Sequence, residues 1–338
     1  MTQQSSDGIL YTMNTHKIIE GDCIKGMATL PDGCVHTCVT SPPYWGLRDY
    51  GHDDQIGAEK TPEAYVENMV EVFREVRRIL RDDGTVWLNL GDSYWSNTLS
   101  RKDPVESMWG KRPASDLSDG RDNIPTVNKR GGLGAAPIGI KPKDLVGIPW
   151  RVAFALQADG WYLRQDIIWH KPNPMPESVT DRCTKAHEYI FMLSKKAHYY
   201  YDHEGIKEDA VGAPHSPGNK NVTQPKEKGA RDPALDPDRV WASDGKKNKR
   251  SVWTVTTKPF KGAHFAVYPK KLILPCILAG CPEGGTVFDP FTGSGTTAVV
   301  ALENRRNFIG TELNPEYIKI AKARIKEEVP QTLEGVFE

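Results

Sequence analysis

Residues 38–51 read CVTSPPYWGLRDYG and place two consecutive prolines directly after a short apolar run. Pro42 and Pro43 have no backbone N–H, each ring fixes its own φ, and the residue before each proline is driven out of the helical region. The turn is therefore rigid and offers hydrogen-bond acceptors only. Because Tyr44 and Trp45 follow at once, this strand end is a candidate site for a group that donates hydrogen bonds.

A second candidate site is the glycine-rich run within TVFDPFTGSGTTAVVALENRRNFIGTEL, residues 286–313. Glycines let backbone approach a ligand closely, and the helix expected after them favours a negative group at its N-terminus. Glu312 follows about twenty residues later, where an α/β nucleotide-binding domain places a carboxylate against ribose hydroxyls. The candidate cofactor-binding residues of the turn are Asp289, Pro290, Phe291, Gly293, Ser294, Gly295 and Thr296.

The glycine-rich turn lacks residues that two common classes of nucleotide-binding site require. Val299 and Val300 fill the region of the third glycine of the NAD fingerprint, which disfavours a dinucleotide and an oxidoreductase. No lysine follows the glycines, as it does in a Walker motif. A nucleoside without a pyrophosphate fits best, and S-adenosylmethionine is the predicted cofactor.

Ser41-Pro42-Pro43-Tyr44 resembles the catalytic motif (Asp/Asn/Ser)-Pro-Pro-(Tyr/Phe/Trp) of the amino-group DNA methyltransferases, which modify exocyclic nitrogens of cytosine or adenine. Residues 289–297 resemble that family's cofactor motif. The order, catalytic motif first, is similar to the β group, and the resemblance covers residues 16–95, 144–204 and 263–323. It implies a Rossmann-like α/β methyltransferase fold: a mostly parallel sheet with helices on both faces and an inserted recognition region.

The resemblance also implies a role for the proline turn. The target amine is conjugated with its ring, so its lone pair is a poor nucleophile. The Ser41 side chain and the Pro42 carbonyl would accept hydrogen bonds from the amine, while Tyr44 stacks on the base flipped out of the duplex. Methyl transfer would then be a direct displacement, in which positioning supplies much of the acceleration.

Further cofactor residues are implied by the same resemblance. Asp22, beside Cys23 after the first expected strand, would reach the adenine amino group; a helix N-cap is a simpler and compatible role. Phe265, within residues 264–269, resembles the segment that closes over the methionine part, although core packing explains it equally well.

Trp45 and Arg48 are candidates to brace the target base and a phosphate, although Arg48 with Asp49 could be a surface ion pair. Asp92 could line the pocket or cap a turn. His170, in a segment that resembles the lining of the base pocket, is expected to be a packed or hydrogen-bonded histidine rather than a general base.

The cysteines indicate neither a nucleophile nor a metal site. Cys276 follows Pro275, as in the Pro-Cys nucleophile of C5 methyltransferases, but it lies in an apolar helical run and is expected to be structural. The six cysteines form no CxxC pair and no Cys/His cluster at metal-ligand spacing. Scattered cysteines fit a reducing cytosol.

Hydrophobic periodicity and turn residues predict the elements that position these sites. Strands are expected at 16–22, 35–40, 84–92, 161–171, 187–195, 286–290 and 307–313. Helices are expected at 23–30, 61–84, 146–160, 269–280, 296–306 and 314–328, the second ended by Gly84. Residues 96–143 lack any period and are rich in Gly, Pro, Ser, Asp and Lys, so a mobile insertion is expected there.

The predicted organisation is a catalytic part at 1–204, a target-recognition region at 205–262 and a cofactor-binding part of the same core at 263–338. The chain has a formal net charge of zero, so a DNA-binding surface must be built locally. Residues 213–262 contain eleven Lys and Arg against five Asp and Glu, which suits phosphate contacts, although a solvated linker would look similar. The candidate DNA contacts there are Lys246, Lys247 and Arg250.

The predicted function is a site-specific DNA methyltransferase that acts on the N4 amine of cytosine, since Ser-Pro-Pro-Tyr after Thr and before Trp is commoner among the N4 enzymes of the family. An N6-adenine enzyme is the main alternative. An RNA or protein methyltransferase is more distant, because those families carry Asn-Pro-Pro-Tyr downstream of the cofactor motif. A catalytically inactive DNA-binding protein is disfavoured by the joint presence of Asp22, Ser41, Pro42, Tyr44, Asp289 and Glu312.

The expected setting is the cytoplasm of a bacterium, or a phage modification system. The N-terminal residues do not resemble a signal peptide, and the longest apolar run, LILPCILAGC, is too short for a membrane span. Double-stranded DNA is the expected partner, with or without a cognate restriction endonuclease, and the protein is expected to be a monomer or a homodimer.

Overall fold

The structure is a computed structural model that describes residues 3–4, 10–11, 15–46, 55–95, 139–209, 246–257 and 267–329. Within these residues, an eight-stranded sheet has the order β10-β6-β7-β5-β4-β11-β12-β3. Its strands run parallel except β7, which pairs antiparallel with both β5 and β6. The strands are β3 (His16–Glu20), β4 (Val35–Thr40), β5 (Leu80–Leu90), β6 (Tyr162–His170), β7 (His187–Ser194), β10 (Val252–Thr254), β11 (Thr286–Asp289) and β12 (Asn307–Glu312).

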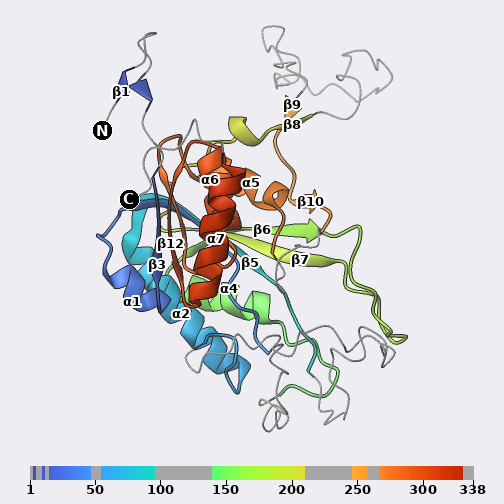
Figure 1. Cartoon of the computed structure of the whole chain (residues 1–338). Helices are drawn as coiled ribbons and strands as arrows, with labels where there is room; N and C mark the ends of the chain where they lie inside the picture. Colours follow the sequence, from blue (N-terminus) through green and yellow to red (C-terminus); the bar gives the residue numbers. More distant parts are fainter. Residues whose placement is uncertain are drawn as a thin grey trace, which may run out of the picture.

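Helices cover both faces of this sheet (Figure 1). One face packs against α1 (Cys23–Ala28), α2 (Pro62–Ile79) and α4 (Ile148–Ala158). The other packs against α5 (Lys270–Gly280), α6 (Thr296–Glu303) and α7 (Pro315–Glu328), which lie in front of the sheet in Figure 1. Each face buries its own apolar cluster, so the predicted α/β fold with helices on both faces is confirmed.

Small elements lie outside the main sheet. β1 (Gln3–Gln4) pairs with β2 (Leu10–Tyr11), and β8 (Glu208–Asp209) pairs with β9 (Lys246–Lys247). A 3₁₀ turn spans Glu204–Ile206. β10 falls within the predicted recognition region, yet it is an edge strand of the main sheet. Most of the predicted insertion at 96–143 lies outside the described residues.

The longest helix, α2, shows one boundary that the sequence predicted wrongly. Thr61 caps its start by accepting from the Ala64 N–H at 3.2 Å, and Pro62 occupies the first turn. The helix ends at Ile79 rather than at Gly84, because Leu80 already pairs with Val35 as the start of β5. Gly84 lies inside β5, where a Cβ would come within 2.9 Å of the His36 carbonyl oxygen.

The strand order brings distant parts of the chain to one edge of the sheet. The proline turn follows β4, and the glycine-rich turn follows its neighbour β11. Asp22 follows β3, and Glu312 ends β12, on one side of this pair. On the other side lie the end of β5, the start of the antiparallel β7 and the end of β6. Carboxyl ends of parallel strands are the usual place for ligands in such folds.

Candidate active site

The two sequence motifs are joined directly by a hydrogen bond. Thr40, the last residue of β4, donates its hydroxyl to Oδ1 of Asp289, the last residue of β11, at 2.7 Å. Cys38 pairs with Phe288 in the same parallel ladder. The acceptor turn and the glycine-rich turn therefore start side by side.

The acceptors of the proline turn differ in whether a described residue already donates to them. The Pro43 carbonyl oxygen already has a partner, because it accepts a hydrogen bond from the Tyr65 hydroxyl at 2.9 Å. The Pro42 carbonyl oxygen accepts no hydrogen bond from any described residue. The Ser41 hydroxyl is half-buried and donates to the Tyr44 hydroxyl at 3.3 Å. Lone pairs of Ser41 and Pro42 thus remain for another donor.

Tyr44 lies between the turn and the end of β5. A Cβ at Gly91 would lie only 2.6 Å from Cε2 of Tyr44, so the ring requires glycine there. Its hydroxyl donates to Oε2 of Glu188 at 2.9 Å and lies 3.2 Å from Oδ1 of Asn89. Burial, and then the nearby Glu188 carboxylate, raise the pKa of Tyr44 well above its usual value. Tyr44 is therefore a protonated donor.

Glu188 and Asn89 were not identified from the sequence, although both lie beside the proline turn. Glu188 is the second residue of β7, and its side chain is 16% exposed. It pairs with Lys171, whose ammonium also lies 4.2 Å from the centre of the Trp169 ring. A charged residue at the start of a buried strand was the available signal, but the sequence does not show that β7 starts at this edge.

The glycine-rich turn has the backbone freedom that its sequence predicts. Gly293 and Gly295 have φ values of +52° and +79°, which L residues with side chains rarely adopt. A Cβ at Gly295 would also lie 2.8 Å from Cβ of Ala321 on α7. Pro290 is buried and Phe291 is half-buried, and the Pro290 carbonyl accepts a hydrogen bond of 2.6 Å from β12.

Glu312 holds the turn and the start of α7 through its carboxylate. Its two oxygens accept the backbone N–H groups of Gly293 at 2.7 Å and Asn314 at 2.9 Å. Burial raises the pKa of Glu312, and these two hydrogen bonds oppose the rise. A carboxylate has about four acceptor sites, so Glu312 keeps some acceptor capacity, and contact with ribose hydroxyls stays a prediction.

The carboxylate of Asp289 is buried and already accepts hydrogen bonds from four other residues. It is 1% exposed, and its carboxylate accepts from Thr40, from Thr297 at 2.6 Å, from the Phe291 N–H at 3.0 Å and from Tyr268 at 3.3 Å. Burial raises the pKa of Asp289, and these hydrogen bonds oppose the rise. Direct contact between its side chain and a cofactor stays a prediction.

The side chains of Ser294 and Thr296 face α7. Both are buried, and Arg324 donates from one guanidinium nitrogen to the Ser294 carbonyl and hydroxyl and to the Thr296 hydroxyl, at 2.8–3.0 Å. The side chain of Arg324 is 13% exposed. Arg324, which the sequence did not single out, therefore holds both residues, and their contact with a cofactor stays a prediction.

At the end of β3, Asp22 is the N-cap of α1, with its carboxylate accepting from the Lys25 N–H at 2.9 Å. The capping role is confirmed, and contact with adenine stays a prediction. Burial raises the pKa of the neighbouring Cys23 thiol to about 12. Cys276 is 1% exposed and its pKa is also raised by burial, as expected for a structural cysteine.

Three other expectations have clear outcomes. Trp45 was expected to brace the target base, but that prediction was wrong. Trp45 is 3% exposed, stacks on Trp95 at 6.1 Å and donates its indole N–H to the Glu59 carbonyl at 2.9 Å, so it belongs to the core. Asp92 caps α4 by accepting from the N–H of Gly147 at 3.0 Å and that of the next residue at 3.1 Å. His170 lies 3.1 Å from the Thr254 hydroxyl, as a hydrogen-bonded histidine.

The candidate DNA contacts lie away from the proline turn. Lys246, Lys247 and Arg250 lie just before the edge strand β10, four strands from β4, or roughly 19 Å at the usual strand spacing. Arg250 and Lys247 both approach Glu208, at 2.5 and 3.7 Å. Arg48 and Phe265 lie outside the described residues.

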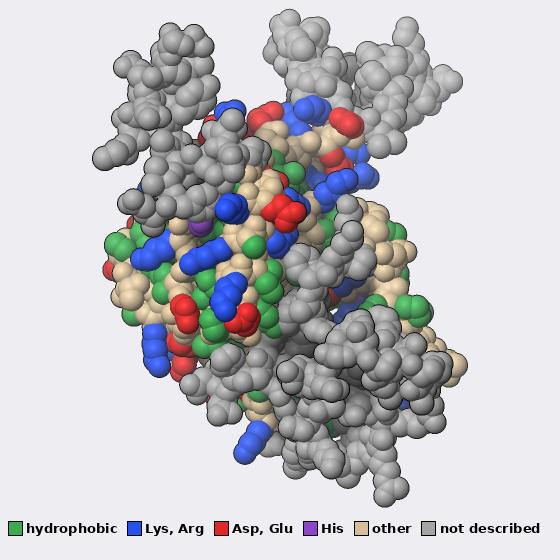
Figure 2. All heavy atoms as spheres, viewed as in Figure 1, with side chains coloured by type: hydrophobic (Ala, Val, Ile, Leu, Met, Phe, Trp, Pro, Cys, Tyr) green, Lys and Arg blue, Asp and Glu red, His purple; other side chains and the backbone are tan. Residues whose placement is uncertain are grey.

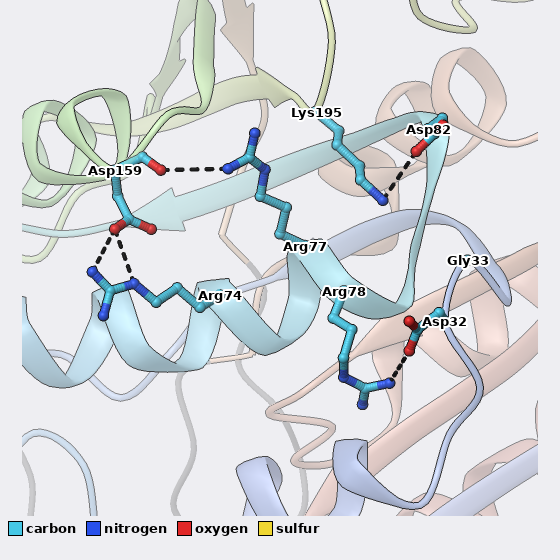
Figure 3. A pocket seen from close by; sticks show the side chains of 8 residues that line it. All are labelled: Asp32, Gly33, Arg74, Arg77, Arg78, Asp82, Asp159 and Lys195. Atoms are coloured by element: carbon cyan, nitrogen blue, oxygen red, sulfur yellow. Dashed lines mark hydrogen bonds and ion pairs between the residues drawn. The ribbon is translucent and has the colours of Figure 1, made fainter.

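A cavity of about 730 Å³ opens at the opposite edge of the sheet (Figure 3). It is lined by Asp32, Gly33, Arg74, Arg77, Arg78, Asp82, Asp159 and Lys195. Most of these charges already pair with one another: Arg74 with Asp159 at 2.6 Å, Arg78 with Asp32 at 2.6 Å and Lys195 with Asp82 at 3.2 Å. We interpret this cavity as an ion-pair cluster that ties α2 to neighbouring loops.

Two findings bear on metals and membranes. In the described ranges, no group of three or more His, Cys, Asp and Glu side chains is arranged to hold a metal ion. Among the helices of the same ranges, none is long and apolar enough to cross a membrane.

A family model and several related sequences match most of the chain. The family model for N6 and N4 methyltransferases, described as DNA methylase, matches residues 35–323. The type II methyltransferase M.SmaI of Serratia marcescens is 46% identical over 322 residues, which are 95% of this chain and 94% of that protein. M.Cfr9I of Citrobacter freundii, also a type II methyltransferase, is 45% identical over 94% of this chain and 89% of that protein.

Solved structures show the same fold. The PvuII DNA methyltransferase, described as cytosine-N4-specific, superposes with a TM-score of 0.58 at 16% identity, over 96% of this chain and 95% of that chain. A candidate DNA modification methylase of Thermus thermophilus, complexed with S-adenosyl-L-methionine, gives a TM-score of 0.55 at 24% identity, over 94% of this chain and 97% of that chain. Since the family model spans most of the sequence, this chain belongs to the N6/N4 DNA methylase family and is a DNA methyltransferase.

Proposed function

We propose that the protein transfers a methyl group from S-adenosylmethionine to the exocyclic N4 amine of cytosine in double-stranded DNA, after flipping the base out of the duplex. The observation that carries this proposal is the pairing of the two turns. The acceptors of Ser41 and Pro42 follow β4, the glycine-rich turn follows β11, and Thr40 joins the two strand ends through Asp289 at 2.7 Å.

The residues at the β11, β12 and β3 ends fit S-adenosylmethionine. Gly293 and Gly295 provide backbone that a ligand can approach closely, and Glu312 retains acceptor capacity for ribose hydroxyls. Asp22 lies at the end of the next strand, where it is available to the adenine amino group. When bound, the cofactor supplies an electrophilic methyl group. Pro290, Phe291, Ser294 and Thr296 shape this site through backbone and packing, while Cys23 and Phe265 complete the proposed set.

On the acceptor side, the protein orients the amine. The Pro42 carbonyl and the Ser41 hydroxyl accept its two N–H groups, which turns the nitrogen lone pair away from conjugation with the ring. Tyr44 offers a ring face to the flipped base, and Gly91 allows that ring to lie against the end of β5. Pro43 keeps the turn rigid because its carbonyl is held by Tyr65.

The choice of cytosine rests on the motif. Ser41 lies between Thr40 and the Pro-Pro-Tyr-Trp run, a context commoner among N4-cytosine enzymes of the family, whereas adenine enzymes more often carry Asp at this position. One solved enzyme of the same fold is described as cytosine-N4-specific.

For DNA binding we propose the region 205–262, with Lys246, Lys247 and Arg250 as phosphate contacts and Arg48 closer to the target base. On the face shown in Figure 2, Lys and Arg side chains are interspersed with Asp and Glu, in keeping with the net charge of zero. Phosphate affinity must therefore come from local groups, and binding should weaken with salt. We place the protein in the cytoplasm, as a monomer or homodimer of a modification system with or without a cognate endonuclease.

The test is to incubate the protein with unmethylated genomic DNA and labelled S-adenosylmethionine, digest the DNA to nucleosides and identify them by mass spectrometry. We expect N4-methylcytosine from the wild type and from Ser178→Ala, which alters an exposed serine, but none from Ser41→Ala. N6-methyladenine would keep the enzyme class and overturn the choice of base. No methylated nucleoside would overturn the proposal.

A further inference from the structure

We infer that Glu188 is a positioning residue that sets the direction of the hydrogen bonds running from Ser41 through Tyr44, so that Ser41 faces the target amine as an acceptor. This inference rests on the proposed function, because it assigns the orientation of the group that would receive the amine.

Four side chains are connected one after another by hydrogen bonds. Ser41 donates to the Tyr44 hydroxyl oxygen at 3.3 Å, and Tyr44 donates to Oε2 of Glu188 at 2.9 Å. The other oxygen of Glu188, Oε1, accepts from the Lys171 ammonium. The side chains of Glu188 and Lys171 are 16% and 18% exposed, so water does little to offer alternative partners. These hydrogen bonds join the turn after β4, the start of β7 and the residue after β6.

The direction of this chain follows from the carboxylate. An ionised carboxylate can only accept, so the Tyr44 proton points toward Glu188. The Tyr44 oxygen then offers its lone pairs to the Ser41 hydroxyl, which donates its proton away from the reaction centre. Both lone pairs of Ser41 are left for the amine. If the chain ran the other way, Ser41 would present a proton to an amine that must itself donate.

Asn89 does not reverse this direction. Its amide nitrogen donates to the Tyr189 carbonyl at 3.0 Å and lies 3.3 Å from Oε2 of Glu188, which places its oxygen toward Tyr44. That oxygen, 3.2 Å from the Tyr44 hydroxyl, is a further acceptor. Every neighbour of the Tyr44 proton is therefore an acceptor, and Ser41 is the donor to Tyr44 among the described residues.

Glu188→Gln is the sharp test, because glutamine has the same shape but one donor end. Lys171 attracts the amide oxygen, so the amide NH₂ turns toward Tyr44 and reverses the chain. We expect the single-turnover rate of DNA methylation to fall by at least about tenfold, since one misdirected hydrogen bond in a transition state is of that order. Dissociation constants for S-adenosylmethionine and for DNA should stay within about twofold of the wild type.

Two further variants separate direction from structure. The double variant Glu188→Gln with Lys171→Met lacks the ammonium that attracts the amide oxygen, so that oxygen can face Tyr44. Its methylation rate should recover several-fold relative to Glu188→Gln alone. In Tyr44→Phe the chain is already cut, so adding Glu188→Gln should lower the rate little further. Glu303→Gln, which loses an ion pair with Lys270 at 2.7 Å on the far side of the fold, is the control and should match the wild type.

The outcomes are distinct. If the wild type makes no methylated nucleoside, the proposed function fails before Glu188 is tested. If the wild type is active and Glu188→Gln methylates at the same rate, the inference is overturned. It is also overturned if the Glu188→Gln effect is undiminished in the Tyr44→Phe background, or if thermal melts show that the lost rate only follows lost folding. Loss in the single variant with recovery in the Lys171→Met pair supports it.

Discussion

The hydroxyl of Thr40 donates a 2.7 Å hydrogen bond to the carboxylate of Asp289, although 249 positions separate the two residues in the sequence. Thr40 precedes the proline turn and Asp289 precedes the glycine-rich turn, so this bond fixes the register of the two turns. Asp289 is 1% exposed, and a buried carboxylate is costly unless its oxygens are satisfied. The bond therefore contributes to stability as well as to alignment.

Replacing Thr40 with Val should destabilise the protein by about 1–3 kcal/mol, because it leaves a buried charged acceptor one donor short. Thr37→Val is a matched control on the same strand: Thr37 is also buried, but its hydroxyl bonds to the neutral Thr85 carbonyl and hydroxyl, at 3.0 Å each. Urea unfolding should show the larger loss for Thr40→Val. Equal losses would mean that the charge of Asp289 does not matter.

Asp289→Asn should change how stability depends on pH. Burial raises the folded-state pKa of Asp289 above its unfolded value of about 3.9, so the contribution of this group is full below that value and is lost as the pH rises through the folded pKa. The stability of the wild type relative to Asp289→Asn should therefore fall as the pH rises from about 4 toward neutrality. Urea midpoints of both proteins across this range check the sign, and a rising difference would contradict it.

Arg324→Met should weaken S-adenosylmethionine binding by about tenfold, since it removes the guanidinium that holds the backbone of Ser294 and the hydroxyl of Thr296. Lys319→Met removes a cation from the same helix, but its side chain is 72% exposed and pairs with Glu316, three residues earlier. Calorimetric titration should show wild-type affinity for that control. Unchanged affinity in Arg324→Met would show that the turn keeps its shape unaided.

Gly91→Ala should lower the methylation rate by about tenfold or more, because the new Cβ would lie 2.6 Å from the Tyr44 ring and must displace it. Cofactor affinity should be unchanged, since Gly91 follows β5 and is separated from β11 by β4. Single-turnover kinetics with parallel cofactor titration test both parts. A variant that methylates normally would place Tyr44 outside the reaction.

Much of the fold could be predicted because local pattern and tertiary context agree. Apolar stretches bounded by glycine and proline mark β4, β11 and β12 nearly to the residue, and the periodicity of α7 marks its length. The end of α2 was misplaced because helical periodicity runs into a strand without a break, and pairing with Val35 decided the boundary. The antiparallel direction of β7 and the membership of β10 in the main sheet depend on long-range pairing, which no local pattern shows.

Candidate site residues could be predicted where they lie within one sequence motif. They could not be predicted where they come from separate segments that meet only in the fold. Ser41, Gly293 and Glu312 belong to motifs whose spacing is visible in the sequence. Glu188 and Arg324 contact these motifs from distant elements, so neither could be singled out. Trp45 was expected to contact the base because it follows the turn, but its indole is buried in the core and donates to the Glu59 carbonyl.

The position of β11 and β12 between β4 and β3 has a consequence for how the protein folds during its synthesis. β3 and β4 are consecutive in the chain, yet two strands made some 250 residues later must be inserted between them. Contacts of such long range are expected to form slowly, and a partly synthesised chain would have to keep this gap open. The proline turn thus emerges early from the ribosome, but the glycine-rich turn reaches it only when β11 and β12 have folded between β4 and β3.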